Sequence, residues 1–156
     1  MQSTDLTTLL QYNNEDVLSR FTDLFEVTET EAADIFTETR KFLFICGQPD
    51  VFIPDELLII DEMWHNFILF TATYQDFCHQ YFGTYLHHQP ASKVEKIRHQ
   101  EQLAADVATT RKVFNEKLTR FMTVTYDQLG HDTMIKWFQQ YPVQYSKQVI
   151  KSLRKN

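Results

Sequence analysis

The sequence predicts an all-α protein. Apolar residues recur at helical spacing along most of the chain, for example in residues 17–25. Capping boxes begin at Thr28 and Ser92, each with a glutamate three residues further on, and this pattern is typical of a helix start. Three glycines and four prolines are too few for the many tight turns of an all-β fold. We therefore expect about six helices in a single compact domain over residues 1–156.

Three helices are expected in the N-terminal part of the chain. Residues 3–12 form a short one with leucines along one side. Asn13 or Asn14 caps the second helix, because asparagine side chains accept hydrogen bonds from the first free N–H groups. Thr28 caps the third, which extends over about residues 29–46 and is followed by a glycine and a proline.

The next helix begins near Pro54, since the first turn of a helix does not need the N–H group that proline lacks. On an ideal helix Asp61 and His65 lie one turn apart at the edge of a polar stripe. The same geometry places Glu62 and Asn66 in that stripe. The opposite side of the helix is broadly apolar.

Trp64 lies in the middle of this apolar face, so we expect it in the core, and it is also the candidate aromatic anchor for a binding partner. A further helix rich in aromatic residues follows and ends at Gly83. From Ser92 one long helix is expected over about residues 93–128. The remaining segment contains a short helix capped by Asp132, and the tail 143–156 is either an appended amphipathic helix or frayed.

Charge is divided unevenly along the chain, whose net charge is −6. Residues 1–62 hold fourteen acidic and three basic residues, whereas residues 63–156 hold seven acidic and twelve basic ones. One interpretation is that the two halves pack together with opposite charges facing each other. The other is an acidic face that binds a protein partner with a basic surface. The candidate residues of that face are Glu29, Glu31, Asp34 and Glu38.

Composition excludes several classes of protein. Net acidity disfavours nucleic acid as the main ligand. No apolar run reaches the length of a membrane span, and no signal-peptide pattern stands at the start, so a cytoplasmic protein is expected. Cys46 and Cys78 do not form a disulfide framework. The aromatic surroundings of Cys78 predict a small buried apolar side chain in preference to a nucleophile.

Asp61, His65 and one of the adjacent pair His87 and His88 are the candidate metal ligands. A carboxylate and two imidazoles make a three-ligand set with an open coordination position for one divalent transition metal. Neighbouring residues in an extended segment point to opposite sides, so only one histidine of the pair is expected to join the set. The alternative is structural: His65 makes one hydrogen bond to Asp61. The spacing does not match an established zinc signature.

The stretch from residue 61 to residue 90 resembles the core motif of the glycine-rich domain-containing protein-like family. This motif combines an Asp-x-x-Trp-His start with a His-His-x-Pro end. The resemblance implies a helical domain and brings no established activity with it. The motif residues fall here on Asp61, Trp64, His65, Tyr74, Cys78, His87, His88 and Pro90.

Two functions remain open from the sequence, and they belong to different classes. The first is a small non-enzymatic protein-binding or regulatory module whose acidic N-terminal half contacts a protein partner. The alternative is a metal-dependent enzyme or metal-binding protein that uses Asp61, His65 and His87 or His88. The oligomeric state is left open.

Overall fold

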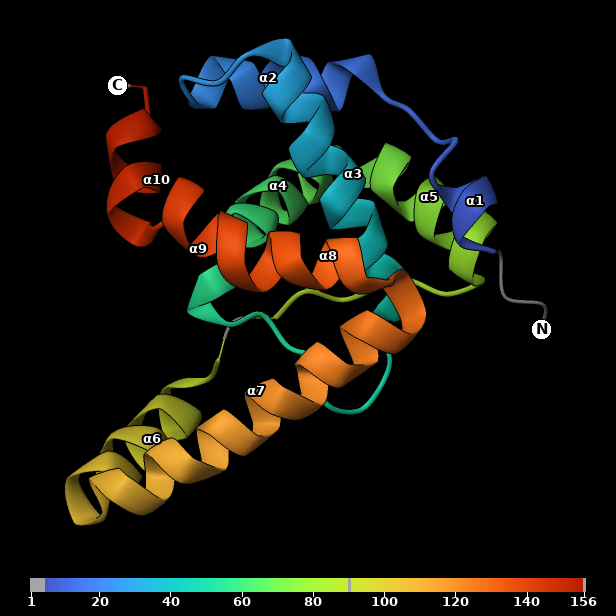
Figure 1. The fold of residues 1–156 in the computed structure, drawn as a ribbon. Coiled ribbons are helices and arrows are strands. Elements are labelled where there is room, and N and C mark those ends of the chain that lie inside the picture. Colours follow the sequence, from blue (N-terminus) through green and yellow to red (C-terminus); the bar gives the residue numbers. More distant parts are fainter. Residues whose placement is uncertain (1–4, 90, 156) are drawn as a thin grey trace.

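The computed structural model describes residues 5–89 and 91–155 and confirms the all-α class (Figure 1). Within these residues no strand forms, although Phe25 and Arg154 make an isolated antiparallel β-bridge. Residues 3 and 4 of the predicted first helix, and Pro90 of the 61–90 motif, lie outside the described residues. The helical elements, of which η1 is a 3₁₀-helix and η2 a π-helix, are α1 Leu6–Leu9, α2 Glu15–Leu24, α3 Glu29–Ile45, η1 Asp55–Leu57, α4 Leu58–Ile68, α5 Thr71–Phe82, α6 Lys93–Ala105, α7 Val107–Leu129, α8 His131–Ile135, η2 Lys136–Gln140, α9 Tyr141–Gln144 and α10 Lys147–Leu153.

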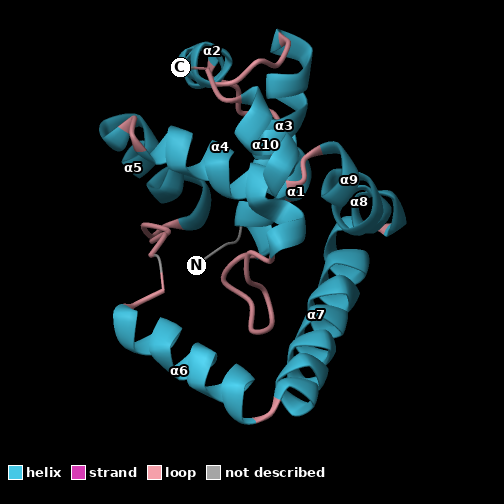
Figure 2. Cartoon of the chain, turned by 90° about the vertical axis from the view of Figure 1, so that its left-hand side faces the viewer, coloured by secondary structure: helices cyan, strands magenta, loops and turns pink. Residues whose placement is uncertain are grey.

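Helix α3 runs through the middle of the molecule, with α2, α4 and the C-terminal helices around it (Figures 1 and 2). It begins where the sequence predicts, since the Thr28 hydroxyl accepts a hydrogen bond from the Glu31 N–H at 3.0 Å. Helices covered on several sides bury residues around most of their circumference. Accordingly α3 buries apolar and polar residues alike, including Phe36, Phe42 and Glu38.

Helices α2 and α4 are joined through the buried side chain of Asn66. Its amide nitrogen donates to the Val17 carbonyl at 2.9 Å, and its oxygen accepts from the Arg20 guanidinium at 2.7 Å. Only 2% of Asn66 is exposed. The polar stripe predicted on this helix is therefore only partly a solvent face, because α2 covers Asn66 and Arg154 pairs with Glu62 from the C-terminal end of the chain, whereas His65 is exposed.

The long helix predicted over residues 93–128 is wrong as a single element, because the chain divides it into α6 and α7. Asp106 separates the two helices and caps α7, with its carboxylate accepting from the Thr109 N–H at 2.9 Å and from the Thr109 hydroxyl at 2.7 Å. Its backbone has left the helical region, with φ −155° and ψ 88°. The chain thus changes direction at one residue, and α6 and α7 diverge from it in a V (Figure 2).

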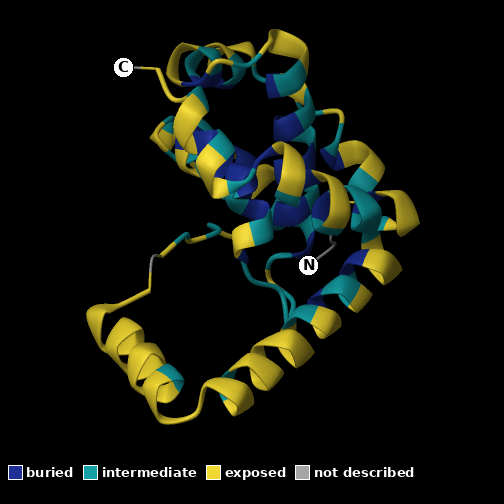
Figure 3. Ribbon diagram, turned by 60° about the vertical axis from the view of Figure 1, so that its left-hand side comes forward, coloured by how far each residue is buried: buried dark blue, intermediate teal, exposed yellow. Residues whose placement is uncertain are grey.

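Helices α6 and α7 together project from the body as an arm (Figure 3). No residue of α6 is buried, and α7 buries Phe121 and Thr125 near its C-terminal end. Apolar side chains such as Val94 and Phe114 remain exposed on the arm. Within the part of the chain that the structure describes, no helix combines the length and the apolarity that crossing a membrane requires.

The C-terminal segment is folded against the body. Helix α8 begins at His131, one residue before the predicted cap Asp132, which lies in its first turn. Ser146 caps α10. Backbone hydrogen bonds then join the tail to the end of α2, from Glu26 N–H to the Leu153 carbonyl at 2.7 Å and from Lys155 N–H to the Leu24 carbonyl at 2.9 Å. Of the two alternatives for the tail, the structure shows a docked helix.

Replacement of Asn66 by leucine should destabilise the protein by about 1–3 kcal/mol, the usual cost of leaving a buried polar group without its partner. Leucine has a similar volume but cannot bond the Val17 carbonyl or Arg20. Urea unfolding followed by circular dichroism measures the change. Asn115→Leu on the exposed side of α7 is the matched control and should alter stability by less than about 0.5 kcal/mol. Equal effects of the two substitutions would contradict a special role for Asn66.

Candidate metal site

Asp61, His65 and His88 meet at the surface of α4. The Asp61 carboxylate lies 2.6 Å from Nε2 of His88 and 3.7 Å from Nδ1 of His65. The candidate ligand atoms of the three residues all lie within 4.8 Å of one another. From the adjacent pair of histidines, the structure brings His88 to Asp61.

Helix α4 places Asp61 and His65 on the same side, one helical turn apart. The helix follows η1, which begins after Pro54. Asp61 is partly covered, with 22% of its side chain exposed, whereas 57% of the His65 side chain is exposed. The imidazole of His65 therefore has room to change rotamer while Asp61 is held closer to the body.

His88 is carried by an extended segment between α5 and α6, residues 84–89, which we call the strap. Gly83 ends α5 in the left-handed region, at φ 70°, as its position in the sequence predicts. The strap then returns across α4. It is fixed by Tyr74, whose hydroxyl donates to the Leu86 carbonyl at 2.6 Å and accepts from Nε1 of Trp64 at 2.9 Å. Burial raises the pKa of the Tyr74 phenol, so it keeps the proton that it donates.

Aromatic stacking orients the His88 ring. It lies parallel to Trp64, with ring centroids 4.0 Å apart and an interplanar angle of 7°, and it also stacks with His65 at 4.5 Å. His87 has an exposed side chain whose ring contacts Tyr85 at 4.8 Å. The alternation of an extended segment explains why one histidine turns inward and its neighbour does not.

Trp64 occupies the core position that its place on the helix predicts. It is 5% exposed and packs against Phe42 of α3, with ring centroids 5.8 Å apart. Its indole N–H is used by Tyr74. Such a side chain positions the strap and the His88 ring from inside the molecule.

The candidate acidic residues of α3 mostly face the C-terminal helices. Glu38 is 2% exposed, accepts a hydrogen bond from Nε1 of Trp137 at 2.9 Å, and pairs with Lys41 at 3.2 Å and Lys136 at 3.4 Å. A carboxylate so deeply buried is stabilised only when donors and cations surround it. Glu38 is therefore part of the packing between α3 and η2.

Asp34 and Glu31 are engaged in the same interface. Asp34 pairs with Lys136 and accepts from the Tyr141 hydroxyl at 2.9 Å, and Glu31 accepts from the Tyr145 hydroxyl at 3.2 Å. Burial raises the pKa values of both tyrosines, and the nearby carboxylates raise them further. Asp34 and Glu38 thus follow the first interpretation of the charge pattern, in which opposite charges of the two halves face each other, and Glu31 contacts the same half through a neutral tyrosine. Glu29 is exposed.

The two cysteines are thiols held in apolar surroundings. Cys78 is fully buried, and burial raises its pKa. Burial likewise raises the pKa of Cys46 to about 11. A reactive cysteine needs a stabilised thiolate and access to solvent, so the structure agrees with the apolar role expected for Cys78.

A groove of about 600 Å³ opens beside the ligand set. It lies between the end of α3, residues 51–53, the start of α4 and the strap. Asp61, His88 and His87 line it, together with Lys117 of α7. Its apolar wall consists of Phe42, Val51, Phe52, Ile53, Leu58 and Trp64.

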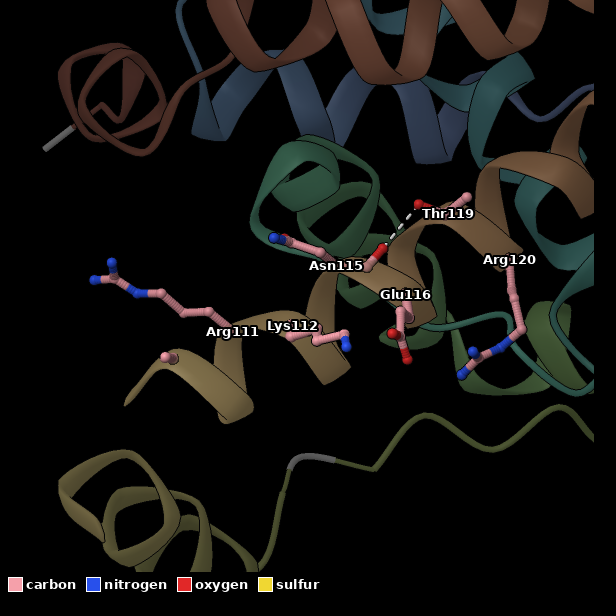
Figure 4. A pocket seen from close by; sticks show the side chains of 7 residues that line it. Arg111, Lys112, Asn115, Glu116, Thr119 and Arg120 are labelled. Carbon is pink, nitrogen blue, oxygen red and sulfur yellow. Dashed lines mark hydrogen bonds between the residues drawn. The ribbon is translucent and has the colours of Figure 1, made fainter. Parts of the chain in front are cut away.

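A second hollow, of about 670 Å³, lies along α7 (Figure 4). Arg111, Lys112, Glu116 and Arg120 line it, and Figure 4 shows Arg111 pointing away from the others. All of its lining side chains are exposed. All of the residues that line it belong to α7, and it contains no candidate metal ligand set, so this hollow is a less favourable binding site than the groove.

Residues 9–120 of the chain match the model of the UCP032817-like family. The chain belongs to this family. The match includes Asp61, His65 and His88, and it ends before the C-terminal helices. The description of the family names no activity.

The resemblance of residues 61–90 to the glycine-rich domain-containing protein-like family is therefore wrong, because the family that matches is a different one. The short motif on which it rested consists of helix-packing aromatic residues and a histidine pair, which unrelated helical proteins can share. No curated protein and no solved structure matches the chain.

Replacement of Tyr74 by phenylalanine should loosen the strap. The substitution keeps the buried ring but removes the hydroxyl that joins Trp64 to the Leu86 carbonyl, at a cost of about 1–3 kcal/mol. Amide hydrogen exchange should become faster in residues 85–89, and urea unfolding gives the change in free energy. Tyr126→Phe, at a tyrosine that is 51% exposed, serves as the control. Unchanged exchange in the strap of Tyr74→Phe would contradict this account.

Proposed function

We propose that this protein binds one divalent transition metal ion through Asp61, His65 and His88. The observation that carries the proposal is the convergence of one carboxylate and two imidazoles within 4.8 Å. Two imidazoles with one carboxylate suit zinc and also non-haem iron(II), and three protein ligands leave at least one position open. That position gives the site room for a water molecule or an added ligand.

Small side-chain movements bring the set to metal-binding geometry. Zinc lies about 2.0–2.1 Å from imidazole nitrogen, so tetrahedral ligand atoms are about 3.3 Å apart. Asp61 and His88, now 2.6 Å apart, would separate slightly, and His65 would approach Asp61 from 3.7 Å. His65 is the most exposed of the three, and a rotamer change there disturbs no core contact.

The support from outside the three residues is the way the strap is held. In many metal sites the ligands are oriented by neighbouring hydrogen bonds and packing before the metal arrives. Here Tyr74 fixes the strap and Trp64 stacks on the His88 ring. A purely structural Asp61–His88 hydrogen bond would need neither His65 nor an open position beside it.

Binding of a basic protein partner through the acidic residues of α3 stays a prediction. The side chains of Glu31, Asp34 and Glu38 already contact the C-terminal helices. A partner at that face would therefore depend mainly on Glu29. Charge reversal at Glu29 should then weaken association in a salt-dependent manner, since exposed charges act mainly through screened long-range attraction.

Zinc titration of the chelator-treated protein, without a histidine tag, tests the metal proposal. Calorimetry should give one zinc ion per chain, and zinc should raise the unfolding temperature. His65→Ala and His88→Ala should each weaken zinc binding by more than about tenfold, a loss already seen when only the supporting residues of metal sites are removed. Zinc affinity should fall as the pH falls, because both imidazoles must be neutral to bind metal.

His87→Ala and His99→Ala are the matched controls, since both histidines are exposed and neither belongs to the ligand set. Their zinc affinity should equal that of the unmodified chain. Absence of zinc and iron(II) binding by the unmodified protein would overturn the proposal. So would unchanged zinc binding in His65→Ala, which would reduce Asp61 and His88 to a structural pair.

A further inference from the structure

The groove beside the metal site has a composition that favours one class of ligand. One wall of the groove is apolar and partly aromatic, with Phe42, Phe52 and Trp64 among its residues, and the rest of the lining is polar. Its volume of about 600 Å³ falls within the range of small-molecule sites, which is about 300–1,000 Å³. Such sites bind the apolar body of a ligand by burial and orient it through a few polar groups.

The polar groups at the groove favour a negatively charged head group. Lys117 lies over the Phe52 ring at 4.2 Å and makes no ion pair within the described residues. The two carboxylates that line the groove are already engaged. Asp61 contacts His88, and Glu95 completes the capping box of Ser92. His87 and Gln89 also line the groove, and Lys117 is the lysine there whose charge has no carboxylate partner among the described residues, so it is available to an anionic ligand.

The groove also adjoins the candidate ligand set. Asp61 and His88 both line it, whereas His65 does not. A metal ion held by the three residues would thus have ligand atoms on the groove side. Carboxylate oxygen is a good ligand for zinc and for iron(II), so an anion in the groove can complete the coordination.

We propose that the groove binds a small carboxylic acid with an apolar body, such as a medium-chain fatty acid. The apolar body lies against residues 51–53 and Trp64. The carboxylate is bound by Lys117 and by the metal at Asp61 and His88. The contribution of the metal rests on the proposed function, while those of Lys117 and the apolar wall do not.

Calorimetric titration with butyrate, hexanoate and octanoate tests this, with zinc-loaded and chelator-treated protein measured separately. Affinity should rise by about 2- to 4-fold for each added methylene, as expected when methylene groups are buried. Octanoate should bind more tightly to the zinc-loaded protein than to the metal-free protein. Octanol, which has the same chain without the charge, should bind more weakly than octanoate to both.

Lys117→Gln keeps most of the side chain but removes the charge, so octanoate binding should weaken by about 5-fold, the effect of one partly solvated charged hydrogen bond. Zinc affinity should not change in this variant. Val51→Trp should abolish octanoate binding by filling the groove. The matched control is Lys112→Gln, at an exposed lysine of the same helix outside the groove.

The outcomes separate the two proposals. Zinc binding without octanoate binding would overturn the proposal that the groove binds a carboxylic acid, and would leave the metal proposal intact. Octanoate binding that depends on Lys117 and Val51, in a protein that binds no zinc, would support the groove and overturn the metal site. Equal octanoate binding by Lys117→Gln and Lys112→Gln would overturn the assigned role of Lys117 and with it the proposal.

Discussion

The burial of the Glu38 carboxylate is the constraint on which the arrangement of the helices depends. A charge removed from water is strongly destabilising unless hydrogen-bond donors and cations replace the lost hydration. Trp137, Lys136 and Lys41 supply them, and two of these belong to the C-terminal segment. That segment must therefore lie on α3. Phe42, one turn further along α3, then packs between Trp137 and Trp64, at 6.2 Å and 5.8 Å, which connects the same interface to the wall of the groove.

The candidate site depends on a second buried polar group, the Tyr74 hydroxyl. Because burial keeps it protonated, it can accept from Trp64 and donate to the strap at the same time. This bridge joins α4, α5 and the strap, three consecutive segments of the chain, and presents His88 to Asp61. The most exposed member of the candidate set is then His65. For the proposed metal site, two ligands would be positioned by the fold and the third would reach the metal by a rotamer change.

The groove is built from both halves of the chain, which explains its mixed character. Residues 51–53 are held against α7 by the ion pair of Asp50 with Arg120 at 3.1 Å and by the packing of Phe52 on Phe121 at 5.5 Å. Asp50 adopts a left-handed backbone, with φ 66°, where the chain turns. The arm thereby brings Lys117 to the groove, whose apolar wall comes from the N-terminal half. A positive charge and an apolar wall therefore lie together in the groove.

The sequence by itself determined the helices whose ends carry local signals and the pairing of Asp61 with His65. Thr28, Ser92 and Gly83 act through hydrogen bonds and backbone angles within a few residues. Asp61 lies beside His65 because the two residues are one helical turn apart. Asp106 and Thr109 offered a similar local signal, which the apolar spacing over residues 93–128 obscured. Only the tertiary structure decided that His88 joins Asp61, that Asn66 is buried, and that three acidic residues of α3 face the C-terminal helices. Each of these results from contacts between residues distant in the chain, which local spacing does not contain.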